Sequence, residues 1–270
     1  MQVIGHRIAW SYLMLLSFIL ASRQFKAFRQ AAFKPRVLCI YLTTAVLIGI
    51  NWLVYVWAVN ANFIVEASLG YFINPLLSVL MGVVFLRERL RPFQWIPLTV
   101  ATIGVIYLSI VYGRLPWIAL TLAFTFSTYG LVKKIAPLGS VYGLTLETGI
   151  LFIPAILYLV FTDVSGTGAF LHSSLTTNLL LIGSGLITTM TLLMFASAVQ
   201  SLPLSIIGIM EYIAPMIAFL LGVVVYKEPF DRAQLIGFGM VWAALTLFAI
   251  EGFWSRRAAP VKPIPRLGES

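Results

Sequence analysis

Charged residues are scarce in this sequence. Charged residues make up only 10% of the 270 residues, whereas hydrophobic residues make up 60%, and the mean hydropathy is +0.98. A water-soluble domain of this length could not bury so much apolar surface, but a lipid bilayer can accommodate it. The composition therefore predicts an all-α polytopic membrane protein.

Cysteine is also nearly absent. The single cysteine, Cys39, lies inside an apolar run, which excludes an internal disulfide and a cysteine-based metal cluster. The two histidines, His6 and His172, are far apart, and the chain has no HExxH, GxxxxGK[ST] or GxSxG motif. We therefore expect no metal site, no cofactor and no enzymatic activity.

Basic residues outnumber acidic residues by 18 to 9, yet they do not form a nucleic-acid patch. They lie in short connections and in the C-terminal tail. Basic residues at the ends of membrane spans are typical of topology control and of contact with anionic lipid headgroups. We therefore expect the lipid bilayer as a partner, and no nucleic acid.

Apolar runs long enough to cross a bilayer recur along the chain. Nine spans are predicted, at about 4–22, 37–59, 64–86, 93–112, 116–132, 141–162, 178–199, 204–226 and 233–253. The connections are mostly short, so neighbouring helices are expected to be antiparallel. The tail, 255–270, is basic and rich in proline, and we expect it to be disordered and cytoplasmic.

Two of these runs share a pattern. "NPLLSVLMGVVFLRE" at 74–88 and "APMIAFLLGVVVYKE" at 214–228 place a proline, a glycine and a terminal glutamate at the same offset of 140 residues. A constant offset over such different residue types indicates internal duplication. The aligned residues are Pro75 with Pro215, Gly82 with Gly222, and Glu88 with Glu228.

The duplication predicts two repeats, at 1–112 and 113–254. The second repeat holds five predicted spans and the first holds four, because the counterpart of 116–132 would lie before residue 1. We therefore expect a five-plus-five plan whose first helix is missing here. The run at 4–22 is interpreted as a retained span, because it aligns with an ordinary span of the second repeat.

The distribution of basic residues indicates that the two repeats are inverted. The connection 22–36 has five Lys/Arg residues and no acid, whereas its repeat partner, 162–176, has no Lys or Arg. Placing 22–36 in the cytoplasm puts most basic residues and the C-terminus on that side, as the positive-inside rule requires. Inverted repeats are typical of secondary transporters.

Several segments also carry a specific family pattern. They are "GHRIAWS" (5–11), "NWLVYVWAVN" (51–60), "EASLGYFINPLLSVLMGVVFLRERL" (66–90), "QW" (94–95), "PWIAL" (116–120) and "YGLVKK" (129–134). Together they resemble the RarD branch of the EamA family, in the drug/metabolite transporter superfamily, over almost the whole chain. The resemblance implies a bacterial inner-membrane permease with ten helices in two inverted halves. The N-terminus departs from that pattern, since the family's first helix is absent.

Glu211 is the first candidate for a functional carboxylate. A charge near the centre of a membrane helix costs about 2.5–3.5 kcal/mol on insertion scales, so each one requires a reason. Glu211 lies within its span, four residues before Pro215, whose missing N–H frees a backbone carbonyl one turn earlier. It could bind substrate or carry a proton; the alternative is an acid that only packs against a neighbouring helix.

Glu147 is the second candidate, and the repeat aligns it with Arg7. The two residues could form a gated ion pair or bind the opposite charges of a zwitterion. Alternatively, both simply reach the membrane interface, since each lies near the end of its span.

Polar and aromatic residues extend the predicted pathway. Glu66 begins a stripe of polar residues and small residues that includes Asn74. Such a stripe suits either a water-accessible pathway or tight helix packing. Trp57, with its neighbours Trp52 and Tyr55, could stack on a ring-bearing substrate. Further pathway candidates are Asn51 and Tyr71, with Pro75, Pro215, Gly82 and Gly222 as helix-break or backbone positions. We interpret Glu88 and Glu228 as solvated loop charges, with a gating role as the alternative.

The sequence thus predicts a secondary transporter that moves a small metabolite or drug-like compound by alternating access. Half-helices around Pro75 and Pro215 are expected to line the pathway. A rival interpretation is a non-transporting membrane scaffold or sensor subunit, including an inactive truncated permease. A membrane enzyme is a weaker third interpretation. A homodimer is compatible with the sequence.

Overall fold

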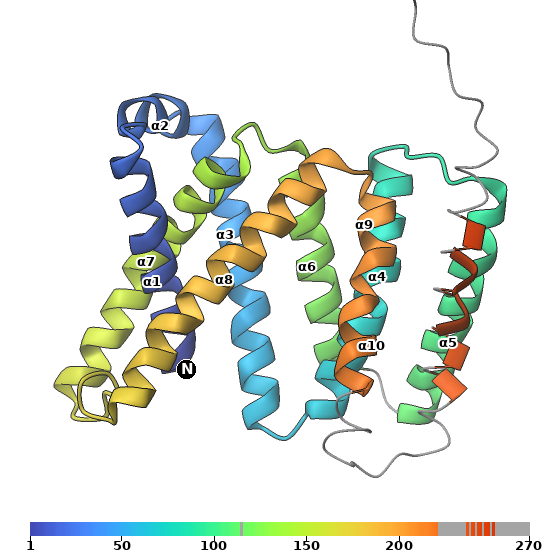
Figure 1. The fold of residues 1–270 in the computed structure, drawn as a ribbon. Coiled ribbons are helices and arrows are strands. Elements are labelled where there is room, and N and C mark those ends of the chain that lie inside the picture. Colours follow the sequence, from blue (N-terminus) through green and yellow to red (C-terminus); the bar gives the residue numbers. More distant parts are fainter. Residues whose placement is uncertain are drawn as a thin grey trace, which may run out of the picture. The chain divides into compact units, whose positions relative to one another are not determined.

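The computed structural model describes residues 1–113, 116–220, 236, 237, 239, 240, 242–244, 246–248, 250 and 251. Every element assigned within them is a helix, which confirms the predicted all-α class (Figure 1). The helices are α1 (Gln2–Ala21), α2 (Phe25–Ala32), α3 (Pro35–Asn60), α4 (Ile64–Phe85), the 3-10 helix η1 (Pro92–Gln94), α5 (Trp95–Tyr112), α6 (Trp117–Ile135), α7 (Ser140–Val164), α8 (Leu175–Ser201), α9 (Leu204–Glu211) and α10 (Ile213–Leu220). The predictions for Gly222, for Glu228 and for the tail at 255–270 lie outside the described residues.

Six of the described helices are long and apolar enough to cross a membrane. The segments are Gln2–Ala21, Pro35–Asn60, Glu66–Phe85, Pro92–Val111, Ser140–Val164 and Leu175–Ser201. The apolar stretch Leu204–Ile217 is shorter. The helix α6 is less apolar because two lysines occupy its last turn. The chain is therefore a multi-pass membrane protein, as the composition predicts.

The chain divides into two compact units. The first comprises residues 1–88 and 115–215, and the second comprises 89–114 and 216–270. In the second unit, Arg91 lies 3.4 Å from the carboxylate of Glu251. All residues that line the cavity described below belong to the first unit.

Helices that the 140-residue offset relates pack against each other in the first unit. The helix α1 contacts α7, and α4 contacts α9. Both pairs are antiparallel: Gly5 faces Leu159 and Gly149 faces Tyr12 in the first pair. The neighbours are exchanged as well, since α1 contacts α8 while α3 contacts α7. Antiparallel packing and exchanged neighbours are what an inverted duplication produces.

Helix boundaries follow the same offset. Pro35 begins α3 and Leu175 begins α8, while Ile64 begins α4 and Leu204 begins α9. Close packing between the repeats relies on glycine: a Cβ atom at Gly208 would lie 2.7 Å from the carbonyl oxygen of Pro75. The helices α4 and α9 therefore approach each other at backbone distance, as small residues allow in membrane helices.

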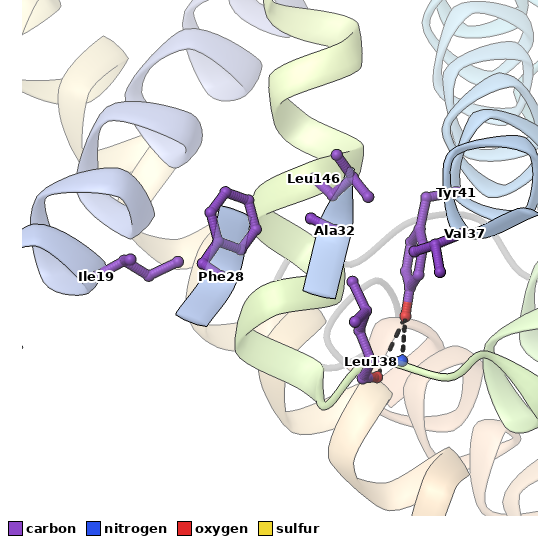
Figure 2. Close-up of a cluster of buried hydrophobic side chains, with 7 residues drawn as sticks. All are labelled: Ile19, Phe28, Ala32, Val37, Tyr41, Leu138 and Leu146. Carbon is purple, nitrogen blue, oxygen red and sulfur yellow. Dashed lines mark hydrogen bonds between the residues drawn. The ribbon is translucent and has the colours of Figure 1, made fainter. Parts of the chain in front are cut away.

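The short helix α2 connects α1 to α3 and is held by a buried apolar cluster. Figure 2 shows this cluster, which consists of Ile19, Phe28, Ala32, Val37, Tyr41, Leu138 and Leu146. The hydroxyl group of Tyr41 donates to the carbonyl of Leu138 and accepts from its N–H group, at 3.2 Å in each case. The cluster thus joins α1, α2, α3 and α7 to the connection before α7.

Candidate functional site

A cavity of about 410 Å³ lies among α1, α3, α4, α6, α8, α9 and α10 in the first unit. Most of its lining is apolar, and its polar groups are few. The lining residues are Arg7, Asn51, Trp52, Tyr55, Ala67, Gly70, Tyr71, Asn74, Leu122, Phe126, Ile187, Thr188, Thr191, Leu192, Phe195, Glu211 and Ala214. Its size and composition are those of a small-molecule site.

The two repeats contribute corresponding residues to this cavity. Pairs of lining residues are separated by the 140-residue offset, and each pair joins one residue of the first repeat to one of the second. The pairs are Asn51 and Thr191, Trp52 and Leu192, Tyr55 and Phe195, Tyr71 and Glu211, and Asn74 and Ala214. The cavity therefore lies where the two repeats meet, and among these pairs Tyr71 and Glu211 place a carboxylate opposite a neutral residue.

Glu211 lies at the centre of a polar network that joins three helices. Its Oε2 atom accepts hydrogen bonds from Asn74 Nδ2 at 2.9 Å and from Ser78 Oγ at 3.0 Å. Ser127 Oγ on α6 donates to the side-chain oxygen of Asn74 at 2.8 Å. Ser78 and Ser127 are buried. This network fixes one carboxylate oxygen of Glu211 at the wall of the cavity.

The backbone beside Glu211 is interrupted. The helix α9 ends at Glu211 and α10 begins at Ile213, so the break falls at Tyr212. Pro215 has no N–H group to donate to the carbonyl of Glu211 four residues earlier, which is the effect expected of a proline within a helix. The equivalent helix differs, because α4 continues unbroken through Pro75 from Ile64 to Phe85. The expectation of half-helices is therefore wrong at Pro75, and only Pro215 accompanies a helix break.

Arg7 contributes a cation to the cavity wall. Its Nε atom donates to Thr188 Oγ1 at 2.9 Å, and its guanidinium carbon lies 5.0 Å from the ring centroid of Trp52. Within the described part of the chain, Arg7 forms no ion pair with a carboxylate. The cavity therefore holds a guanidinium and a carboxylate that do not neutralise each other.

The other predicted pathway residues on α3 and α4 divide between the cavity wall and the exterior. Asn51 lines the cavity and donates to the carbonyl of Leu122 and to Thr125 Oγ1, at 2.9 Å in both cases. Tyr71 also lines it, with its ring centroid 5.9 Å from that of Tyr55 in an edge-to-face arrangement. Trp57 does not line the cavity.

Trp57 lies on the outside of the first unit. Its ring packs beside those of Phe63 and Trp117, with centroid distances of 5.7 Å, and 41% of the residue surface is exposed. Aromatic residues at such positions are typical of contact with lipid or the membrane interface.

Glu66 and Glu88 each bind the N-terminus of a helix. Glu66 Oε1 accepts from the N–H of Ile118 at 2.9 Å, at the start of α6. Glu88 accepts from the N–H groups of Leu204 and Ser205, at 2.7 and 2.8 Å, at the start of α9. The first helical N–H groups lack intrahelical partners, so a carboxylate satisfies them. Glu66 is not among the residues that line the cavity.

The interpretation of Glu88 as a solvated loop charge is wrong, because its carboxylate reaches the backbone of α9. Gly82 provides the space for this contact: a Cβ atom there would lie 2.7 Å from Glu88 Oε2. Gly82 is therefore a packing position beside this contact, and it does not line the cavity.

Glu147 lies outside the cavity in a second polar cluster. It forms an ion pair with Lys133 on α6, with 2.9 Å between Nζ and Oε1, and the two side chains are 0% and 1% exposed. The hydroxyl group of Tyr129 donates to Glu147 Oε2 at 3.2 Å. Arg7 and Glu147, which the repeat aligns, thus have different partners. Among the described residues, no three His, Cys, Asp or Glu side chains gather as metal ligands.

The sequence does not single out Lys133, because "KK" at 133–134 follows the predicted span 116–132, where basic residues are usual. The available signal was Glu147 itself: a carboxylate within a membrane helix requires a partner. The pair also shows why one lysine can be fully buried, since charges in such surroundings are retained only when they are paired.

Comparisons with known proteins agree with this architecture. The model of the EamA-like transporter family matches residues 1–110 and 115–250. A solved crystal structure has a TM-score of 0.66 to this chain, with 17% identity, and the match covers 92% of this chain and 87% of the other. At that identity the likeness concerns the fold alone.

Bacterial relatives are similar over nearly the whole chain. An uncharacterized transporter, YojE, of Bacillus subtilis is 42% identical over 264 residues, covering 96% of this chain and 87% of the relative. Protein RarD of Escherichia coli is 38% identical over 256 residues, covering 95% and 86%. An uncharacterized transporter of Vibrio cholerae is 39% identical over 259 residues, covering 96% and 86%. The chain therefore belongs to the RarD branch of the EamA family of membrane transporters.

Proposed function

We propose that this permease carries a small amphipathic solute through the cavity that contains Arg7 and Glu211. The observation that carries the proposal is the presence of one guanidinium and one carboxylate in the same cavity, each held by neutral neighbours and not by the other. Opposite charges in one low-dielectric cavity suit a solute that bears an anionic group and a cationic or donor group. Aromatic side chains supply apolar contact for the rest of the solute.

Alternating access between the repeats is the proposed mechanism. On α1 and α4 the lining residues lie in the N-terminal half of each helix, on α6 they reach its midpoint, and on α3 they lie in the C-terminal half, whereas on α8 they extend from the midpoint toward the C-terminus. Because α4 runs parallel to α6 and is joined to α3 by a short connection, the lining parts of α1, α3, α4 and α6 lie toward one end of the first unit, and α8 extends the lining to its middle (Figure 1). We name that end the cavity end. The opposite end, where α2 lies, is named the α2 end.

Two carboxylate contacts support a closed α2 end. Glu88 holds the start of α9 there, and Glu147 is paired with Lys133 near the end of α6. In the proposed transport cycle these contacts open when the cavity becomes accessible from the α2 end. The positive-inside rule makes the α2 end cytoplasmic, and we place the protein in the bacterial inner membrane with a cytoplasmic C-terminus.

The proposal is for transport and not catalysis, with Glu211 binding the solute or carrying a proton. It is tested first by thermal unfolding of the detergent-purified protein with amino acids, organic acids, nucleosides and chloramphenicol. A solute at a hundredfold excess over its Kd stabilises the bound state by about 2.7 kcal/mol. A stabilising solute should then be taken up by proteoliposomes. If no solute stabilises the protein and none crosses the membrane, the scaffold or sensor interpretation is favoured instead.

A further inference from the structure

The helix α2 has two chemically different sides. Phe28 and Ala32 are buried, with 6% and 0% of their surface exposed, and they anchor α2 in the apolar cluster of Figure 2. Phe28 also packs edge-to-face on Tyr142 of α7, with 5.6 Å between ring centroids. The orientation of α2 on the first unit is therefore fixed by packing, and its opposite side faces outward.

The outward side of α2 and its flanks is strongly basic. Its cations are all exposed, and no acid occurs between residues 22 and 36. None of these cations forms an ion pair within the regions that the structure covers. The cations are Arg23, Lys26, Arg29, Lys34 and Arg36.

Two aromatic side chains lie among these cations. Phe25 is 42% exposed and Phe33 is 63% exposed, at the two ends of α2. Because α2 joins the ends of two membrane-spanning helices, this surface lies at the level of the lipid headgroups. Exposed cations beside exposed aromatic rings are the composition of a helix that lies in the membrane interface.

The second repeat shows that the fold does not require this surface. The equivalent connection, 162–176, joins α7 to α8 without any Lys or Arg, and it contains a contact of 3.0 Å between His172 and Asp163. Topology control accounts for basic residues at the cytoplasmic ends of helices. It does not account for their placement around a folded amphipathic helix with two exposed phenylalanines.

We propose that α2 and its flanks form a binding surface for anionic phospholipids. Headgroup phosphates contact the five cations, and Phe25 and Phe33 enter the upper acyl region. Each basic residue near an anionic membrane surface strengthens attraction about fivefold. The surface is separate from the cavity and does not depend on the identity of the transported solute.

The test measures lipid binding to the purified protein by native mass spectrometry, with phosphatidylglycerol and phosphatidylcholine as probes. The variant carries Lys26→Gln, Arg29→Gln, Lys34→Gln and Arg36→Gln. The matched control carries Arg256→Gln, Arg257→Gln, Lys262→Gln and Arg266→Gln, which removes the same charge from the basic tail. We expect the variant to bind phosphatidylglycerol at least tenfold more weakly than wild type, and the control to bind within twofold of wild type. Equally weakened binding of phosphatidylglycerol in the variant and the control would overturn the proposal, because lipid binding would then depend on total charge and not on the cations around α2.

Wild-type protein provides a second test if the variant does not insert into the membrane. Binding of phosphatidylglycerol should exceed that of phosphatidylcholine at least tenfold and should weaken as salt is raised, because exposed charges are screened. Glycerol 3-phosphate, which has the charge but no acyl chain, should not compete at equal concentration. Equal binding of the two lipids, or full competition by glycerol 3-phosphate, would contradict a lipid surface at α2.

Discussion

Glu211 on α9 accepts a hydrogen bond of 2.9 Å from Asn74 on α4, and these helices are counterparts in the two repeats. One bond thus connects the two halves of an inverted duplication at the wall of the cavity. A contact of this kind responds when the repeats change their relative position, so Glu211 can link solute binding to the movement of α4 against α9. The predictions below separate that role from simple packing.

Replacing Glu211 with Gln should lower solute uptake at least tenfold while leaving the fold intact. The amide oxygen of Gln can still accept from Asn74 and Ser78, so the network survives but the negative charge is lost. Uptake into proteoliposomes and thermal unfolding check the two halves of the prediction. Asp163→Asn, which neutralises an exposed acid outside the cavity, is the control. Unchanged uptake by Glu211→Gln at every pH would exclude both solute binding and proton transfer by this carboxylate.

Arg7→Gln should weaken binding of the solute by about tenfold or more, and Arg7→Lys should restore only part of it. The guanidinium donates to Thr188 through Nε and lies over Trp52, and the ammonium of Lys cannot reproduce that planar arrangement. The shift in unfolding temperature at increasing solute concentration measures the affinity. Arg89→Gln, at an exposed position outside the cavity, should behave like wild type. An analogue of the solute without its anionic group should be insensitive to Arg7→Gln.

Glu88→Gln should make the cavity more accessible from the α2 end. Gln offers one neutral acceptor where the carboxylate satisfies two N–H groups of α9, and hydrogen bonds to charged groups contribute about 1.5–3 kcal/mol. The measurement is labelling of Thr191→Cys, in a Cys39→Ser background, by a membrane-impermeant maleimide applied from the cytoplasmic side.

Glu66→Gln provides the matched control for the labelling experiment. Glu66 also binds a helix N-terminus, but it does so at the cavity end, on α6. Its substitution should not increase cytoplasmic labelling. If both variants label equally, loss of stability and not opening of the α2 end explains the effect.

The sequence predicts the helices better than it predicts the partners of buried charges. Hydropathy and the 140-residue offset locate α1, α3, α4, α7 and α8, because each depends on a pattern within the chain. Glu211, Asn74 and Arg7 could be chosen as cavity residues because polar groups within a membrane span are costly. Their meeting in one cavity follows from the contacts of α4 with α9 and of α1 with α8, which the sequence does not specify.

The partners of Glu66, Glu88 and Glu147 could not be predicted in the same way. Glu66 and Glu88 bind backbone N–H groups of distant helices, and such groups have no signature in the sequence. Glu147 was aligned with Arg7 by the repeat, yet it pairs with Lys133 because α6 packs between α3 and α8, and α6 has no counterpart in the first repeat within this chain. Alignment of the repeats identifies equivalent positions. An ion pair, in contrast, forms only between side chains that lie at the same depth in the membrane and pack together.

Removing one partner of the buried ion pair should cost more stability than removing both. Lys133→Met leaves Glu147 charged and buried, and Glu147→Leu leaves Lys133 in the same condition, with an expected cost of about 3–5 kcal/mol each. The double variant leaves neither Lys133 nor Glu147 as an unpaired buried charge and should be closer to wild type. Thermal or denaturant unfolding of the three variants in detergent measures the coupling. Additive losses in the double variant would show that the two charges do not act as a pair.

Gly208→Ala should destabilise the contact between α4 and α9, because the new Cβ atom would lie 2.7 Å from the carbonyl oxygen of Pro75 and 2.9 Å from Ser78 Cβ. Overpacking of this kind costs about 1–3 kcal/mol, and here it would also push Glu211 away from Asn74. Gly183→Ala on α8 is the matched control, since no atom lies within 4 Å of its added Cβ. We therefore expect Gly208→Ala to lower both the unfolding temperature and solute uptake, while Gly183→Ala changes neither. A stable Gly208→Ala protein with normal uptake would mean that α4 and α9 need not approach at backbone distance during transport.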